Sequence, residues 1–152
     1  MKRIVGVVAV VVVVFVFIAA DKTPSAEELI DVLGLRHSKV FCKYGVPVKM
    51  YVDRGPTKEE DYIIFDYLQF GLVFHHEMIR QILFYPEWKG GKIRKIDIGM
   101  SKDEVIKIMG EPQEEVALND GRTRITYLEP DKYFDVILST SNVVNMIRFE
   151  VK

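Results

Sequence analysis

The chain has 152 residues, of which 49% are hydrophobic, and its 21 Lys and Arg against 22 Asp and Glu give a formal net charge of −1. Without Lys2 and Arg3 of the N-terminal leader, 19 basic residues stand against 22 acidic ones, a net charge of −3. This balance lacks the basic excess that is typical of nucleic-acid binding or of a polybasic membrane-binding surface, so we expect no nucleic-acid partner. The single cysteine, Cys42, excludes an intramolecular disulfide.

The first twenty residues predict export of the chain. Lys2 and Arg3 give a basic start, residues 4–18 are an apolar run, and two alanines end it. These are the three parts of a secretory signal peptide, which we predict to be cleaved after residue 20. The alternative is an uncleaved anchor, because the stretch is close to the roughly 17 residues that span a bilayer. We therefore expect an extracytoplasmic location (periplasm, cell envelope or secreted), with membrane contact only through residues 1–20 if they are retained.

An internal repeat is visible when the chain is shifted by 65 residues. Residues 33–47 then align without a gap with residues 98–112, and residues 78–84 align with residues 143–149. Agreement at both ends of the unit predicts a duplication. Four pairs are identical in the first alignment: Gly34 with Gly99, Val40 with Val105, Gly45 with Gly110 and Pro47 with Pro112.

Two short helices are predicted at the start of each repeat, and the repeats are placed at residues 21–89 and 90–152. In the second repeat Ser101 and Glu104 form a capping box, which marks a helix start. Gly110 suits the left-handed position that ends a helix. The other expected helices open at the Ser25–Glu28 capping box, end at Gly45 and, with a weaker signal, cover residues 92–96.

Alternation of apolar and polar residues predicts strands after the helices. The predicted fold class is therefore α+β, with two tandem repeats, each of two short helices followed by a three- to four-stranded antiparallel sheet. Residues 119–121 are a hairpin signal and residues 139–142 a turn. The predicted strands are residues 46–51, 62–67, 72–74, 79–84, 113–117, 122–128, 133–138 and 143–151.

Residues 93–112 resemble the opening of the BamE outer-membrane lipoprotein family, and they are equally similar to the repeat of the β-lactamase inhibitor proteins. The pattern is a Gly99-Met100-Ser101 turn, then Val105, then the stop Gly110-Glu111-Pro112. Both families are small helix–helix–sheet modules without enzymatic activity, and the inhibitor proteins carry two in tandem. The resemblance implies a binding module. The BamE family has one unit and a lipid-bearing cysteine, which this chain does not have at the end of its leader.

Catalytic motifs are absent from the sequence: it has no Gly-rich phosphate loop, no zinc-type cysteine pairs and no nucleophile elbow. We therefore predict no catalytic residue, no cofactor and no metal. His75-His76-Glu77 is interpreted as a solvated hairpin tip, and the alternative is a pair of metal ligands in a metal protein or enzyme. Cys42 lies on a predicted helix, where we expect it half-buried beside the core, the alternative being an exposed thiol.

Aromatic residues are the remaining functional signal, and most of them lie in the first repeat. A strand with one uncovered face directs half of its side chains outward, and Tyr and Trp are enriched in binding hot spots. The alternative is that these rings fill the core and the junction between the repeats, where Trp88 is expected to pack. The predicted binding residues are Tyr62, Tyr67, Tyr85, Trp88, Tyr127 and Tyr133.

The sequence thus predicts a non-enzymatic extracytoplasmic protein-binding module, similar to the inhibitor proteins, with another envelope or extracellular protein as its partner. The alternative function is a component of outer-membrane or envelope assembly and maintenance of the BamE type. Both predictions depend on the resemblance and on the predicted export signal.

Overall fold

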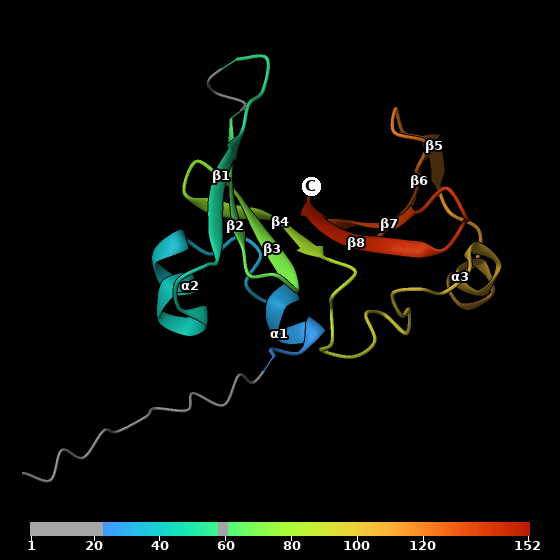
Figure 1. The fold of residues 1–152 in the computed structure, drawn as a ribbon, viewed down its shortest axis with the longest axis horizontal. Helices are drawn as coiled ribbons and strands as arrows, with labels where there is room; N and C mark the ends of the chain where they lie inside the picture. The colour runs from blue at the N-terminus through green and yellow to red at the C-terminus, as the bar shows by residue number, and fades with distance from the viewer. Residues whose placement is uncertain (1–22, 58–60) are drawn as a thin grey trace, which may run out of the picture.

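The computed structural model describes residues 23–57 and 61–152, so the predicted signal peptide lies outside the described residues. The described strands form one antiparallel sheet in the order β1-β2-β3-β4-β8-β7-β6-β5 (Figure 1). β1 lies at one edge of this sheet and β5 at the other. The strands are β1 (Lys49–Asp53), β2 (Tyr62–Asp66), β3 (Phe70–His75), β4 (Met78–Phe84), β5 (Glu114–Ala117), β6 (Thr123–Leu128), β7 (Lys132–Leu138) and β8 (Val144–Val151).

The prediction of two tandem modules, each with its own sheet, is wrong. The last strands of the two halves, β4 and β8, pair with each other, so that Ile82 lies opposite Phe149 and Phe84 opposite Ile147. Two separate sheets would leave both strands with a row of unpaired backbone donors and acceptors. Pairing them removes both edges and produces a single eight-stranded sheet.

Short helices precede the strands of each half. The first half has α1 (Ala26–Ile30) and α2 (His37–Tyr44), and the second half has α3 (Lys102–Met109). α2 and α3 both end at a glycine with positive φ, 73° at Gly45 and 83° at Gly110. A residue with a Cβ rarely adopts this backbone conformation, which explains the glycine at both places.

The two predicted capping boxes are confirmed. The Ser25 hydroxyl accepts a hydrogen bond from the backbone N–H of Glu28 at 3.3 Å, and the Ser101 hydroxyl accepts one from Glu104 at 3.4 Å. Each glutamate in turn accepts a hydrogen bond from the backbone N–H of its serine. α2 has Arg36 at the equivalent position, with no side-chain cap.

Residues 92–96 form a tight turn, so the helix predicted there is wrong. Ile93 and Ile96 form an isolated β-bridge, and Arg94 and Lys95 between them have φ values of 52° and 70°. Both isoleucines are fully buried. Apolar residues three apart fit one helical face, but they also fit the two arms of a two-residue turn, and here the turn buries both.

The sheet has one covered face and one open face. Figure 1 shows α1, α2, α3 and the segment 85–101 on the same side of the sheet. Side chains from these elements, such as Leu29, Val40 and Val105, belong to the same buried cluster as the inward residues of the strands. No helix of the described residues lies over the opposite side, which we call the open face. The strand residues of the core include Phe65, Leu72, Phe74, Ile79, Ile82, Phe84, Ile125, Tyr127, Phe134, Val136, Ile147 and Phe149.

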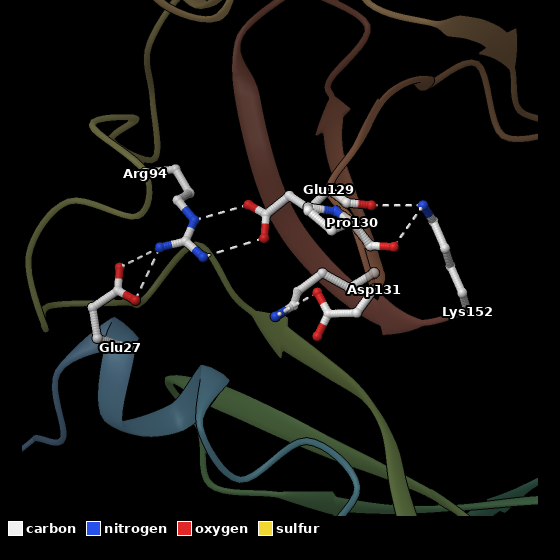
Figure 2. Close-up of polar contacts among 7 residues, drawn as sticks. Glu27, Arg94, Glu129, Pro130, Asp131 and Lys152 are labelled. Atoms are coloured by element: carbon white, nitrogen blue, oxygen red, sulfur yellow. Dashed lines mark hydrogen bonds and ion pairs between the residues drawn. The ribbon is translucent and has the colours of Figure 1, made fainter.

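Arg94 joins the two halves on the covered side (Figure 2). Its guanidinium donates to the Glu129 carboxylate at 2.9 and 3.2 Å and to the Glu27 carboxylate at 2.9 and 3.0 Å. Glu27 belongs to α1 and Glu129 follows β6, so one side chain connects an element of the first half with an element of the second. These carboxylates, Glu129 first, raise the pKa of Arg94 above its usual value.

Several positions that the 65-residue shift pairs play the same backbone role in the two halves. The Gly34 N–H donates to the Ile79 carbonyl at 2.9 Å, and the Gly99 N–H donates to the Val144 carbonyl at 2.8 Å. The isolated bridge between Arg36 and Met78 likewise has its counterpart between Ser101 and Val143. The division of the chain at residues 89 and 90 stays a prediction.

Candidate functional site: the open face of the sheet

The strand register arranges the open-face side chains in rows that cross the sheet. One such row begins with Tyr51 at the β1 edge and passes through Ile64 and Val73, both of which are buried. It continues through two polar residues at the centre and ends on an exposed pair in the second half. The complete row is Tyr51, Ile64, Val73, Gln81, Glu150, Tyr133 and Leu128.

Two tyrosines cover the first half of this face. Tyr85 follows β4, and its ring lies against the backbone of β3, because a Cβ added at Gly71 would stand 2.2 Å from the Tyr85 hydroxyl. Only glycine at position 71 therefore leaves room for this ring. Burial is the main cause that raises the pKa of Tyr85, and a hydrogen bond with Tyr51 adds to it. The first half thus presents an exposed Tyr51 in contact with a partly buried Tyr85.

Charged residues dominate the second half of the open face. Asp135 is only 2% exposed, and its carboxylate accepts hydrogen bonds from Thr126 Oγ1 at 2.6 Å and from Arg148 Nε at 2.8 Å. Beside it, Arg124 pairs with Glu114 at 2.9 Å. These groups line an open hollow of about 520 Å³ whose rim includes Tyr133 and Leu128. The charges are largely paired within the chain, so this surface is polar but nearly neutral.

A larger hollow, of about 1240 Å³, lies at the end of the first half. It surrounds the turn between β2 and β3, where Leu68 is exposed and has a φ of 70°. Tyr51 and Tyr85 extend from the open face into its lining, and the covered side contributes two further tyrosines. Aromatic side chains from both faces of the sheet therefore meet at this end of the molecule.

The six predicted binding residues separate into two groups. Tyr62 and Tyr133 lie on the open face by their register in β2 and β7, and Tyr85, which follows β4, lies against Gly71 on the same face. Tyr62 is partly buried and its ring lies 5.1 Å from that of His75, whereas Tyr133 is 38% exposed. These three residues are brought to one face, as the binding hypothesis requires.

The other three predicted residues help to build the fold. Trp88 is buried, donates from Nε1 to the Gly91 carbonyl at 2.7 Å and packs edge-on against Phe84. Tyr127 is 5% exposed. The Tyr127 and Tyr67 hydroxyls donate to the carbonyls of the two helix-ending glycines, Gly110 at 3.0 Å and Gly45 at 3.1 Å. Burial raises the pKa of Tyr67 to about 12.

The histidine cluster forms the tip of the β3–β4 hairpin, as predicted. His76 and Glu77 are the two turn residues, with φ values of 49° and 69°, and both are exposed. The His75 and His76 rings lie 4.0 Å apart. Within residues 23–57 and 61–152, no group of three His, Cys, Asp or Glu side chains is arranged to hold a metal ion. Cys42 is exposed, so the expectation of a half-buried thiol is wrong.

The β1 edge was not identified from the sequence. Every residue of β1 is exposed, including Met50, Tyr51 and Val52, although the strand has the composition of a half-buried one. Alternation predicts the strand but does not indicate that no other element covers it. The only sequence signal is the position of this strand as the first of the sheet, which does not by itself specify an edge.

No protein-family model matches the sequence, and no curated protein matches it significantly. Solved structures with a similar fold exist. One is an extracellular protein from Bacillus anthracis that contains an SCP domain, with 12% identity and a TM-score of 0.61; the match covers all of this chain and 50% of that protein, so this chain spans about half its length. A DUF4309 family protein from Bacillus subtilis has 14% identity and a TM-score of 0.56, with 77% of this chain and 78% of that chain covered.

A cysteine-rich secretory protein from Staphylococcus aureus is also similar, with 17% identity and a TM-score of 0.51 over 80% of this chain and 45% of that one. At these identities the likeness concerns the fold. None of the three is a BamE or β-lactamase inhibitor protein, so the resemblance inferred from residues 93–112 is wrong. Those twenty residues encode a turn, a capped helix and a glycine stop, which are local features that many folds share.

Within the described ranges, no helix is both long and apolar enough to cross a membrane.

Proposed function

We propose that this protein is an extracytoplasmic, non-enzymatic binding module that holds another protein against the open face of its sheet. The observation that carries the proposal is the uncovered face itself. It presents Tyr51, Tyr85 and Tyr133 on one face of a single antiparallel sheet, and the helices and the segment 85–101 pack against the other face.

The composition of this face supports a protein partner. Tyrosine supplies a large apolar area together with a hydroxyl at little cost in conformational entropy, and it is enriched in interface hot spots. The tyrosines here border a polar centre in which Asp135 and Arg148 already neutralise each other. A surface with aromatic ends and a nearly neutral polar middle fits the ordinary composition of a protein–protein interface.

An extracytoplasmic location supports the same proposal. Residues 1–20 have the composition of a signal peptide. Of the solved structures with a similar fold, one is described as extracellular and another as secretory. We therefore place the binding reaction outside the cytoplasm, with an exported or envelope protein as the partner.

Site-specific photo-crosslinking in the exporting cell tests this function. A photoreactive amino acid replaces Tyr133 in one variant and Tyr62 in a second, and the adducts are identified by mass spectrometry. We expect both open-face positions to give an adduct with the same protein. Binding of that protein, once purified, should then be weakened on the order of tenfold or more by Tyr133→Ala, as is typical of an interface hot spot.

Phe41 supplies a matched control. It is 38% exposed, as Tyr133 is, but it lies on α2 over the covered face. A photoreactive residue at position 41 should not capture the same protein, and Phe41→Ala should leave its affinity unchanged. Adducts of equal yield from positions 41 and 133, or none from either open-face position, would contradict the proposal.

A further inference from the structure

The β1 edge exposes large apolar side chains together with a free strand edge. Met50, Tyr51 and Val52 are 60%, 46% and 45% exposed. β1 pairs with β2 on one side only, so its other side carries backbone donors and acceptors that no other described strand meets. Such an edge is a template for another strand, and native proteins usually protect it with charges, proline or a covering element.

The opposite edge has that protection. β5 is a strand of four residues that carries Glu114 and Glu115. Glu115 accepts from Lys102 Nζ at 2.7 Å, and Glu114 pairs with Arg124. Two acidic side chains and a short length disfavour the addition of a strand at this end. The β1 edge differs from the β5 edge because it exposes Met50, Tyr51 and Val52 in place of ion-paired glutamates.

The charges of β1 are self-complementary. Lys49 and Asp53 lie two residues before and two residues after Tyr51, so all three side chains are on the open face. If a second β1 lies antiparallel with Tyr51 opposite Tyr51, each lysine stands opposite an aspartate and each aspartate opposite a lysine. On the other face the same register places Met50 opposite Val52 twice. Every cross-strand pair in this arrangement is favourable.

Lys49 and Asp53 are available for such pairing. No ion pair joins either residue to another residue of the described ranges, and both are exposed. Within the chain Lys49 lies opposite Asp66, whose carboxylate accepts the Leu68 N–H at 2.8 Å. The cross-strand neighbour of Lys49 is thus already engaged by its own turn.

We propose that a second copy of this chain occupies the β1 edge, through antiparallel pairing of β1 with β1 about a two-fold axis at Tyr51. The pairing is isologous, because the same residues contribute from each copy, and it closes after two subunits. It joins two sheets into one and makes the two open faces continuous. A dimer formed in this way engages Tyr51, which the open face also presents, but it leaves Tyr62 and Tyr133 free, so crosslinking at those two positions tests the bound protein separately from the dimer.

Disulfide trapping of the full-length exported chain tests the axis. In a Cys42→Ser background, Tyr51→Cys places the new thiol of one copy opposite the same thiol of the second copy. Paired strand positions have Cα atoms about 4.5 to 5.5 Å apart, within the range of a disulfide, and the extracytoplasmic environment is oxidising. We expect a covalent dimer, which non-reducing electrophoresis resolves and a reductant abolishes.

Lys49→Cys in the same background is the matched control. In the proposed register Lys49 lies four positions from its own counterpart, about 13 Å along the strand, beyond the reach of a disulfide. Lys49→Cys alone should give at least about tenfold less dimer than Tyr51→Cys, whereas co-expressed Lys49→Cys and Asp53→Cys chains should cross-link to each other. Equal yields from Tyr51→Cys and Lys49→Cys would overturn the proposal.

Charge reversal provides a second test that does not depend on cross-linking. By symmetry, Lys49→Asp or Asp53→Lys alone places two like-charge pairs in the dimer, which should raise its dissociation constant on the order of tenfold at low salt. The double variant Lys49→Asp with Asp53→Lys restores both pairs and should recover the original value. Sedimentation velocity of the purified exported protein measures these constants.

Three further results would overturn the dimer. The first is a chain that stays monomeric at all concentrations, and the second is a double variant as weak as the single ones. The third is a Tyr51→Cys adduct with a chain of different mass, which would assign the β1 edge to another protein.

Discussion

The first and second halves of the sheet repeat their backbone features but differ in the side chains that they present to solvent. At the edge of the first half, Met50, Tyr51 and Val52 are exposed. At the edge of the second half, Glu114 and Glu115 form ion pairs with basic residues. Glycine-ended helices and equivalent backbone hydrogen bonds occur in both. The comparison teaches that the shared positions build the sheet, while the positions that differ decide which surface can accept a partner.

The open face differs in the same way. Its first half contains the buried Ile64 and Val73 together with the tyrosines Tyr51 and Tyr85, and its second half carries the ion pairs of Arg124 and Arg148. Apolar contact stabilises an association through the area that it removes from water, whereas ion pairs satisfied within the chain have little more to offer a partner. We therefore attribute binding strength mainly to the aromatic positions.

The largest effect is expected at the seam between the halves. Phe84 is fully buried on β4, and its ring contacts Trp88 and Phe149, with centroids 4.8 and 6.1 Å apart. Phe84→Ala should lower the free energy of unfolding by about 3–5 kcal/mol, because it leaves a cavity where the halves meet. Chemical denaturation monitored by Trp88 fluorescence and by circular dichroism measures this loss.

The same experiment tests whether the halves fold as one unit. The two probes should report a single coincident transition in the unaltered protein. Leu128→Ala, at an exposed position, should change the free energy by no more than about 0.5 kcal/mol. Separate transitions for the two probes would show that the halves unfold as two independent modules, which would contradict a single cooperative sheet.

A smaller loss is expected from Arg94, whose side chain connects α1 to the β6–β7 turn. Arg94→Met removes the contacts with Glu27 and Glu129 and should destabilise the protein by about 1–2 kcal/mol. Lys92→Met is the control, because its ion pair with Asp97 is exposed and should be worth less than about 0.5 kcal/mol. Thermal and denaturant unfolding measure the free energy of unfolding of both variants. If Arg94→Met loses no more stability than Lys92→Met, Arg94 does not link the halves.

The two tyrosines that hydrogen-bond to the helix-ending glycines sharpen the comparison of the halves. Tyr127→Phe should cost about 1–2 kcal/mol, because the Gly110 carbonyl loses its partner at a partly buried site beside the buried Tyr127. Tyr67→Phe should cost only about 0.5–1 kcal/mol, since water can reach that site more easily. Urea unfolding of the two variants measures the difference, and a reversed order would contradict the burial seen here.

The helix starts give a further matched pair. Ser101→Ala should destabilise the protein by about 1 kcal/mol through the loss of its cap. Arg36 holds the equivalent N-cap position of α2 with φ −77° and ψ 150°, close to the −73° and 156° of Ser101. Arg36→Ser should therefore stabilise the protein by about 0.5–1 kcal/mol. Melting temperatures of both variants decide, and a fall for Arg36→Ser would show that the two starts are not equivalent.

The last prediction concerns stability at alkaline pH. Burial raises the pKa of Tyr67 to about 12, against about 10 in the unfolded chain, and it raises those of Tyr44 and Tyr85 as well. A raised folded pKa means that this stability is complete below pH 10 and is lost as the pH rises from 10 to 12. Between pH 9 and 12 the free energy of unfolding should fall more steeply with pH in the unaltered protein than in Tyr67→Phe. Superimposable profiles would contradict the assignment.

Much of the local structure could be predicted from the sequence. Capping boxes, alternation and turn residues act over a few positions, so the capped helices and most strands were expected close to where they lie. The pairing of β4 with β8 could not be predicted, because it joins Ile82 to Phe149, and no local pattern encodes so distant a contact. The sequence predicts a helix at residues 92–96, where the structure has a turn, because the spacing of Ile93 and Ile96 fits both one face of a helix and the two arms of a tight turn.

The candidate site was only partly accessible from the sequence. Strand alternation indicates that some tyrosines must face outward, and Tyr62 and Tyr133 lie on the open face. It could not distinguish Tyr127, which the covering helix and its own strand bury, from Tyr133. The edge position of β1 depends on which strands find partners, so the exposure of Met50 and Val52 followed only from the complete sheet.

The most direct test of the central claim, that the sheet edge of the first half accepts a further strand and the sheet edge of the second half does not, is hydrogen exchange at the two edges. The exported protein is labelled in deuterated water at low and at high concentration, and the amides of β1 and β5 are compared. We predict that β1 amides exchange more slowly as the concentration rises, while β5 amides exchange at one rate throughout. Equal behaviour of the two edges at every concentration would contradict the account.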